Sequence, residues 1–257
     1  MKRIQRILTK HRRLVRPLAL TLAVVAIFWA VNSPSIVGVS AAARKLPIYN
    51  VKRDNKAVSL TFDAAWGNED TQTLIDILTG YGVKATFFLV GQWVDKYPES
   101  VKALWDAGME IGNHSNDHPH MAQLTEKQIM DEVNACSDKI QAITGQAPKL
   151  FRCPYGEYND TVIRTLEDMD IRPIQWNVDS LDWKELSATE IFNRVKNGVN
   201  PGSIILFHNA AKHTPEALPD IIEYLLAEGY EIVPVSELLL PGEYEIDHTG
   251  MMIAAGA

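Results

Sequence analysis

Three histidines lie within seven residues in the stretch IGNHSNDHPH, which runs from Ile111 to His120. His114 and His118 are four positions apart, a spacing that can direct two imidazoles at one cation. A catalytic zinc takes three protein ligands and leaves one coordination position open. The stretch therefore indicates a candidate metal site, and it leaves open which residue would supply the third ligand.

Ionisable residues, His114 among them, stand directly after short apolar runs that have the length of buried strands. Five of seven such runs are followed by an ionisable side chain, namely Asp63, His114, Arg152, Asp179 and His208. In parallel α/β folds, reactive groups collect at the carboxyl ends of the strands. Each residue could be an ordinary strand-end residue, and Arg152 could form a structural ion pair with Asp179 or Asp182. Five at one edge of one sheet are hard to attribute to chance, so we expect them to meet at a single site.

The apolar runs alternate with segments of helical periodicity. They cover residues 57–62, 84–90, 109–113, 149–151, 171–178, 203–207 and 231–235. Thr125 and Gln128 have the spacing of a capping box at a helix start, and Pro215 and Pro219 fall early in a helix that ends near Gly229. Strands that alternate with helices predict a parallel sheet with helices outside it. Seven repeats favour an α/β barrel or a barrel-like sheet.

The five motifs resemble, in this order, those of the NodB-homology polysaccharide deacetylases, carbohydrate esterase family four. They are Thr61-Phe62-Asp63, His114-Ser115-Asn116-Asp117-His118, Arg152-Cys153-Pro154-Tyr155-Gly156, Asp179-Ser180-Leu181-Asp182-Trp183 and Leu206-Phe207-His208. The resemblance covers residues 57–240 and implies a distorted (β/α)7 barrel. The stretch TFDAAWG, with a single N-terminal hydrophobic segment, further resembles a sporulation-associated subgroup of spore-forming bacteria.

The resemblance implies a metal-dependent hydrolase that removes N-acetyl groups from a cell-envelope polysaccharide such as peptidoglycan. It makes His114 and His118 metal ligands, and imidazole suits zinc as well as other first-row metals. It makes Asp63 the general base that takes a proton from water. Arg152 would pair with Asp63 and hold it ionised, because a nearby cation lowers the pKa of a carboxyl group.

The same resemblance makes His208 the general acid that protonates the departing nitrogen. A neighbouring carboxylate would keep this imidazole protonated near neutral pH; the family pattern implies Asp182, with Asp179 as the alternative. Substrate contacts are implied for three further residues, namely Tyr155 through its backbone N–H at the oxyanion, and Trp183 and Leu206 around the acetyl methyl group.

Ala64 departs from the family pattern, which usually has two consecutive aspartates in the first motif. The second aspartate binds the metal, and alanine has no donor atom, so we expect zinc to bind weakly. Water is one replacement ligand, and the side chains that could serve are Asp63, Asn68, Asp70 and Asp117. The alternative function is therefore a catalytically weakened or inactive, carbohydrate-binding protein of deacetylase type. A glycosidase that uses Asp63 and Asp182 is a third candidate, but it leaves both histidines without a role.

The amino-terminal part of the sequence predicts export. Residues 1–16 contain seven Lys/Arg and no acid, and residues 17–43 are uncharged. Such a segment is long enough to cross a bilayer, and its flanking charges obey the positive-inside rule. Ala41-Ala42-Ala43 offers a signal-cleavage site. We expect an extracytoplasmic body that is either anchored to the membrane or secreted.

The rest of the chain is acidic, since residues 44–257 contain 18 basic and 32 acidic side chains. This balance argues against a nucleic-acid partner, which would need a basic face. We expect a linker at residues 44–56, a monomeric deacetylase domain at 57–240 and a weakly structured tail at 241–257. Cys136 and Cys153 are too few for a disulfide scaffold, and we expect buried free thiols.

Overall fold

The computed structural model of the chain describes residues 44–256. The basic head and the expected membrane segment, residues 1–16 and 17–43, lie outside the described residues. Among the helices that are described, none combines the length and the apolar character that a membrane span requires.

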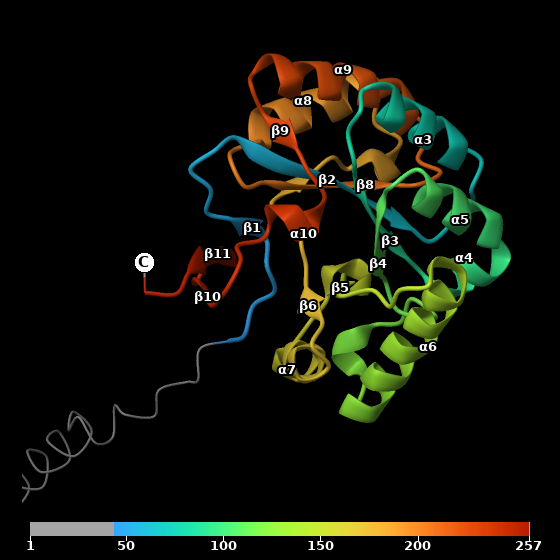
Figure 1. Ribbon diagram of the computed structural model, residues 1–257, viewed down its shortest axis with the longest axis vertical. Coiled ribbons are helices and arrows are strands. Elements are labelled where there is room, and N and C mark those ends of the chain that lie inside the picture. The colour runs from blue at the N-terminus through green and yellow to red at the C-terminus, as the bar shows by residue number, and fades with distance from the viewer. Residues whose placement is uncertain (1–43, 257) are drawn as a thin grey trace, which may run out of the picture. The chain divides into compact units, whose positions relative to one another are not determined.

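A curved parallel sheet forms the centre of the body (Figure 1). Its strands follow the spatial order β6-β5-β4-β3-β2-β8-β7, and β9 pairs with β2. The sheet curls as a half-barrel, which confirms the predicted distorted (β/α)7 class. The strands are β2 (Ala57–Ala64), β3 (Thr86–Leu89), β4 (Glu110–Asn113), β5 (Leu150–Phe151), β6 (Arg172–Pro173), β7 (Val178–Asp179), β8 (Ile204–His208) and β9 (Glu231–Ile232).

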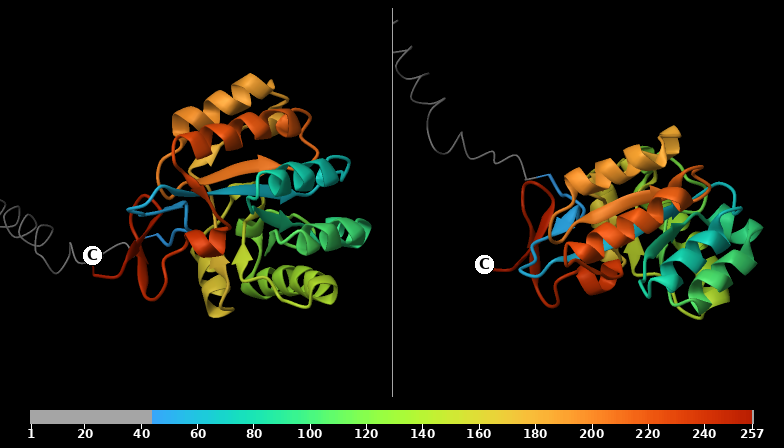
Figure 2. Two further views of the ribbon diagram at one scale, coloured as in Figure 1. Left: turned by 45° about the horizontal axis from the view of Figure 1, so that its top comes forward. Right: turned by 90° about the horizontal axis from the view of Figure 1, so that it is seen from above.

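Helices cover the outer face of this sheet, as Figures 1 and 2 show. The helix that begins after Thr125 has the predicted capping box with Gln128. The helices are α3 (Thr71–Gly80), α4 (Gly91–Lys96), α5 (Pro98–Asp106), α6 (Glu126–Thr144), α7 (Asp160–Asp168), α8 (Ala188–Gly198), α9 (Thr214–Ala227) and α10 (Val235–Leu238). Three short 3₁₀ turns are η1 (Met121–Gln123), η2 (Pro154–Gly156) and η3 (Asp182–Lys184).

The alternation of side chains along β2 separates the core from the site. All eight residues of β2 are buried. Phe62 points into the apolar layer between sheet and helices, where its ring stacks on Phe87 at 4.7 Å and on Phe207 at 5.3 Å between centroids. Because successive side chains of a strand point to opposite faces, Asp63 faces the inside of the half-barrel, and Ala64 returns to the apolar layer.

Each of the seven apolar runs contains a strand, and the run 171–178 contains two, β6 and β7. β6 ends at Pro173, and the next residue, Ile174, still donates its N–H to the carbonyl of Phe151 at 2.8 Å. The run 231–235 is strand only at its start, and α10 begins at Val235. Cys136 and Cys153 are both free and buried, as the sequence predicted.

A second, three-stranded sheet corrects the expected linker and the expected loose tail. β1 (Asn50–Val51) pairs in parallel with β11 (Met251–Ala254), which pairs antiparallel with β10 (Tyr244–Ile246). Figure 2 shows this small sheet beside the central one. The two ends of the body are brought together by pairing across some two hundred positions of sequence, which local sequence patterns do not reveal.

Met252 shows that this small sheet belongs to the folded core, because its side chain is fully buried with Ile48 and Val51. We predict that Met252→Ala lowers the free energy of unfolding by about 2–5 kcal/mol, the usual loss for truncating a buried methionine. Ile253→Ala, on the half-exposed face of the same strand, is the matched control and should cost clearly less. Urea denaturation measures both, and equal losses would contradict the packing.

Candidate active site

The predicted site residues meet in one cavity of about 420 Å³ at the carboxyl ends of the strands. Eight of the ten residues named from the sequence line this cavity. The other two, Arg152 and Asp182, lie behind Asp63 and His208 and contact them directly. Asp63 and His208 are partners in the register between β2 and β8, so the parallel pairing itself places them side by side.

Arg152 holds two other site residues at once. Its Nη1 donates to Asp63 Oδ1 at 2.8 Å, and its backbone carbonyl accepts from His114 Nδ1 at 2.8 Å. The guanidinium is completely buried; it also donates to the carbonyl of Gln175 at 3.1 Å and lies 4.1 Å from the centroid of the Phe88 ring. Asp63 and His114 are therefore oriented by a single residue.

The surroundings of Asp63 keep it ionised. Burial by itself would raise the pKa of this carboxyl, but the charge and hydrogen bond of Arg152, together with the nearby His114 and His208, outweigh burial, and the pKa lies below its usual value. His114 Nε2 lies 3.5 Å from Asp63 Oδ2. Since Nδ1 of His114 donates its hydrogen to the carbonyl of Arg152, Nε2 keeps its lone pair. His114 lines the cavity.

The two predicted metal ligands form an imidazole pair. The rings of His114 and His118 lie edge to face with their centroids 4.9 Å apart. Burial lowers the pKa of both, to about 4 for His118, so both are neutral at pH 7 and able to donate a lone pair. A metal-binding histidine usually gives its second ring N–H to a carbonyl, which is the arrangement of His114.

The loop between these histidines is held by α6. Glu132 Oε2 accepts the backbone N–H groups of Asn116 and Asp117, each at 2.9 Å. Ser115 Oγ accepts the backbone N–H of His118 at 3.0 Å. These bonds support a left-handed backbone at His118, with φ of 56°, which is uncommon for a residue that is not glycine.

Asp182, rather than Asp179, is the direct partner of His208. Its two oxygens accept the ring Nδ1 and the backbone N–H of His208, both at 2.8 Å. Burial would lower the pKa of His208, but the hydrogen bond and the charge of Asp182 outweigh it, and the pKa lies above its usual value. Asp179 lines the cavity and accepts instead from the backbone N–H of Leu181 at 2.8 Å.

Aromatic rings and two aliphatic side chains, those of Ala65 and Leu206, form the walls of the cavity. Tyr155 and Trp183 are exposed and Leu206 is buried at the cavity wall. Tyr155 has a φ of 58° and packs against His118 with 4.6 Å between ring centroids. Six of the seven left-handed, non-glycine residues found in the described chain lie in loops that follow β4, β5, β7 and β8, and such strain gathers at functional sites.

Among the described residues, no further side chain forms a three-ligand metal group with His114 and His118. Within residues 44–256, no three His, Cys, Asp or Glu side chains are grouped so that they could hold a metal ion. Asp117 accepts from Gln92, Asn68 donates to Ser100, and Asp70 accepts from the backbone of Ala210, so these three candidates have partners away from the imidazole pair. The pair fits a metal held by two imidazoles, with water or Asp63 Oδ2 as the nearest further oxygen.

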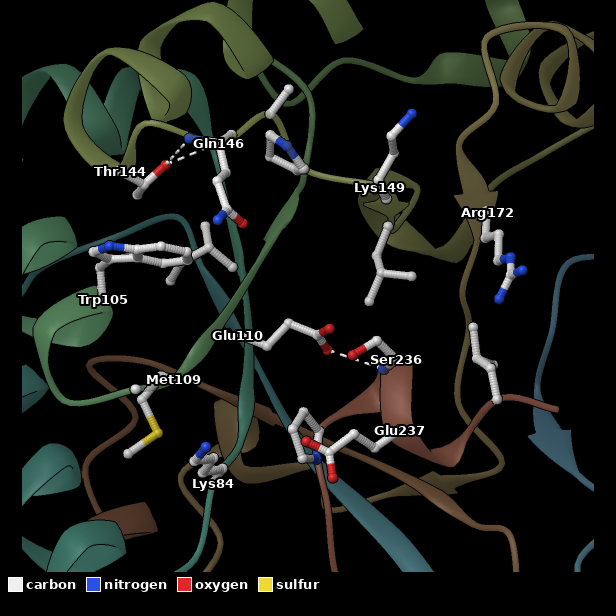
Figure 3. A pocket seen from close by; sticks show the side chains of 17 residues that line it. Lys84, Trp105, Met109, Glu110, Thr144, Gln146, Lys149, Arg172, Ser236 and Glu237 are labelled. Carbon is white, nitrogen blue, oxygen red and sulfur yellow. Dashed lines mark hydrogen bonds between the residues drawn. The ribbon is translucent and has the colours of Figure 1, made fainter. Parts of the chain in front are cut away.

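A second cavity of about 390 Å³ lies at the opposite, amino-terminal ends of the strands (Figure 3). Glu110, at the start of β4, stands in its middle and accepts from Thr86 Oγ1 and from the backbone of Ser236. Lys149 at its edge pairs with Asp170. Glu110 thus joins β3 and β4 to α10, and none of the five sequence motifs reaches this end.

The motif pattern missed several residues of the carboxyl-end cavity, among them Trp66 and Trp176. Trp66 lies only three positions after Asp63, in the stretch TFDAAWG, and its ring stacks on His208. His120, the third histidine of the stretch, is half-exposed; it pairs with Glu157 at 2.8 Å and stacks on Tyr155.

Comparison with known proteins identifies the family. The family model described as polysaccharide deacetylase matches residues 50–174. Peptidoglycan-N-acetylmuramic acid deacetylase PdaC of Bacillus subtilis is 37% identical over 188 residues, which cover 73% of this chain and 40% of PdaC. A peptidoglycan-N-acetylglucosamine deacetylase of Bacillus cereus is 35% identical over 189 residues, which cover 72% of this chain and 69% of the relative. The chain thus spans less than half of PdaC.

Solved structures agree with this relation. Wild-type BA3943 from Bacillus anthracis, described as a CE4 family pseudoenzyme, superposes with a TM-score of 0.73 at 38% identity, over 75% of this chain and 68% of that chain. The fold, the order of the motifs and the matched relatives lead to one conclusion: the chain belongs to the polysaccharide deacetylase family, the family 4 carbohydrate esterases.

Proposed function

We propose that this protein is a metal-dependent polysaccharide N-deacetylase that hydrolyses N-acetyl groups of a cell-envelope polymer such as peptidoglycan. The observation that carries the proposal is the pairing of Asp63 with Arg152 beside the pairing of His208 with Asp182, at one cavity. One pair keeps a carboxylate ionised, and the other keeps an imidazole protonated. Two titratable groups whose pKa values are moved apart are the mark of an acid–base assignment.

Asp63 is the general base in this mechanism. It takes a proton from the attacking water, and Arg152 keeps it ionised and fixed in direction. The backbone N–H of Tyr155 donates to the oxyanion that develops on the acetyl carbonyl. Trp183 and Leu206 hold the acetyl methyl group between them.

His208 is the general acid. It donates its proton through Nε2 to the departing amine nitrogen, while Asp182 holds Nδ1 and stabilises the charged ring. Asp179 adds a second negative charge at the cavity wall. An imidazole held protonated above its ordinary pKa suits a leaving group as basic as an amine.

His114 and His118 would hold the divalent metal, with zinc as the expected ion. A divalent metal, when bound, supplies Lewis acidity for the acetyl carbonyl and for the attacking water. Two imidazoles alone would bind zinc more weakly than two imidazoles with a carboxylate, so a metal held here would exchange readily.

The expected setting is outside the cytoplasmic membrane, where peptidoglycan lies. Residues 17–43 serve as the anchor or as a cleaved signal, and the body works as a monomer on cell-wall polysaccharide. Support comes from the charge pattern of residues 1–43 and from the relatives, two of which are named as peptidoglycan deacetylases. The stretch TFDAAWG supports a role in sporulation.

A carbohydrate-binding protein with weak or absent catalysis is the second candidate. It is favoured by Ala64 and by the absence, among residues 44–256, of a three-residue metal group. The Bacillus anthracis neighbour is described as a pseudoenzyme, and a mutant of it as having restored enzymatic activity. Acetate release separates the two candidates.

We predict that the full-length protein, supplied with zinc, releases acetate from N-acetylglucosamine oligomers or from peptidoglycan. Asp63→Asn should lower this rate by about a hundredfold or more, because the general base is lost. Circular dichroism checks that the variant is folded. Equal release by both proteins would support the binding protein, and new reducing ends without acetate would support a glycosidase.

Zinc affinity tests the role of Ala64. By calorimetry, the native sequence should bind zinc weakly, and Ala64→Asp should tighten binding about tenfold or more by adding a carboxylate ligand. The new side chain must turn from the apolar layer towards the imidazole pair, so Ala64→Asn, with the same shape and no charge, is the matched control. Tight, stoichiometric zinc in the native sequence would contradict the prediction.

Removing the charge of Arg152 tests the buried ion pair. Arg152→Met should lower the free energy of unfolding by about 3–5 kcal/mol at pH 7, because Asp63 is left buried and unpaired. In the wild type, the pKa of Asp63 is lowered, so the stability from this pair is present above the unfolded pKa near 4 and is lost as the pH falls through the folded value. The unpaired carboxyl of the variant takes up a proton at higher pH, so the deficit should shrink as the pH approaches 4.

The control for this experiment is Arg164→Met. Arg164 pairs with Asp160 at 3.3 Å on the exposed surface of α7, and such pairs contribute about 1 kcal/mol or less. Urea denaturation at several pH values measures both variants. A deficit for Arg152→Met that did not change with pH would show that packing, rather than charge pairing, sets the loss.

A further inference from the structure

The exposed apolar side chains of the described chain gather at the candidate site. Five large apolar side chains are exposed between residues 44 and 256, and three of them, Trp66, Tyr155 and Trp183, line the carboxyl-end cavity. Exposed apolar surface that is gathered at one place marks a binding site. Tyr155 and Trp183 belong to the sequence motifs, and Trp66 does not.

Trp66 presents one face to the protein and leaves the other open. Its ring stacks on the imidazole of His208, with 5.5 Å between centroids and 23° between planes. The side chain nevertheless keeps 52% of its surface exposed. A ring that is covered on one face and still half-exposed offers its second face to a ligand.

The loop that carries Trp66 is fixed relative to His208. Asn209, the residue after His208, is buried, and its Oδ1 accepts from the backbone N–H of Ala65 at 3.2 Å. Its Nδ2 donates to the carbonyl of Gly67, which also accepts from Trp93 Nε1 at 2.9 Å. Both neighbours of Trp66 are therefore tied to the end of β8 or to α4, so the backbone that carries the indole is held in place beside His208.

We propose that the open face of Trp66 is a subsite for a second sugar ring, next to the sugar whose acetamido group enters the cavity. A pyranose ring has an apolar C–H face that packs on a flat indole, while its hydroxyl groups remain in water. A sugar on Trp66 also covers His208 from solvent. With this subsite, the protein binds oligomers more tightly than single sugars. It rests on the proposed function for the identity of the reacting sugar.

Sugar binding by the metal-free, full-length protein tests the subsite, because no ligand is hydrolysed. Calorimetry with N-acetylglucosamine and with its dimer and tetramer should show affinity that rises with the second ring. Trp66→Ala should lower the affinity for the dimer about tenfold, which corresponds to about 1.4 kcal/mol. The affinity for the single sugar should stay the same. Trp66→Phe, which keeps a flat ring, should retain most of the gain.

Trp105 provides the matched control, because it lines the cavity at the other ends of the strands (Figure 3). Trp105→Phe should show the same dependence on oligomer length as the wild type. The proposal is overturned if Trp66→Ala keeps the full gain from the second ring, if Trp105→Phe removes it, or if the wild type binds no oligomer.

The two proposals fail in different ways. Dependence of oligomer binding on Trp66, together with no acetate release when zinc is supplied, would overturn the deacetylase and support the subsite. Acetate release, together with a Trp66→Ala variant whose KM and kcat on the tetramer equal those of the wild type, would overturn the subsite and support the deacetylase. A rise in KM with little change in kcat is the result expected of a residue that binds a neighbouring ring.

Discussion

The buried contact between Arg152 and Asp63 organises the site. A guanidinium without solvent exposure must find its partners inside the protein, and Arg152 finds them in a carboxylate, a carbonyl and the ring of Phe88. The same residue uses its backbone carbonyl to orient His114. Since Arg152 directly follows β5 and Asp63 belongs to β2, the contact also ties together two strands that are separated by β3 and β4.

Asp182 orients His208 through charged hydrogen bonds, as Arg152 orients Asp63. Both of its oxygens are used: Oδ1 accepts the ring N–H of His208, and Oδ2 accepts the backbone N–H of His208 and the hydroxyl of Thr214. The two carboxylates of the site thus serve different partners. Asp63 points into the cavity with one oxygen free of Arg152, whereas Asp182 is buried behind the ring that it holds.

The parts that sequence reasoning predicted are those with short-range signals. The capping box of Thr125 and Gln128 and the residues at the strand ends depend on neighbouring positions, and parallel pairing converts strand ends into one site. The hairpin of β10 and β11 was missed because it is stabilised by β1, from the other end of the body. The choice between Asp179 and Asp182 was open because the left-handed turn at Leu181 decides which carboxylate reaches His208.

Ala64 favours a protein without catalysis, whereas the Arg152–Asp63 pair favours an active hydrolase. The energetics of burial help to decide between these two readings. Ala64 packs in the apolar layer, so this position needs no polar atom for the fold. The ion pair is different: a buried pair can often be replaced by apolar residues of similar volume without loss of stability, and sometimes with a gain. A protein that had no use for an ionised carboxylate in this cavity would gain little by burying Arg152 to maintain one. The buried pair therefore favours chemistry at the cavity, and the expected weak binding of a metal follows from Ala64.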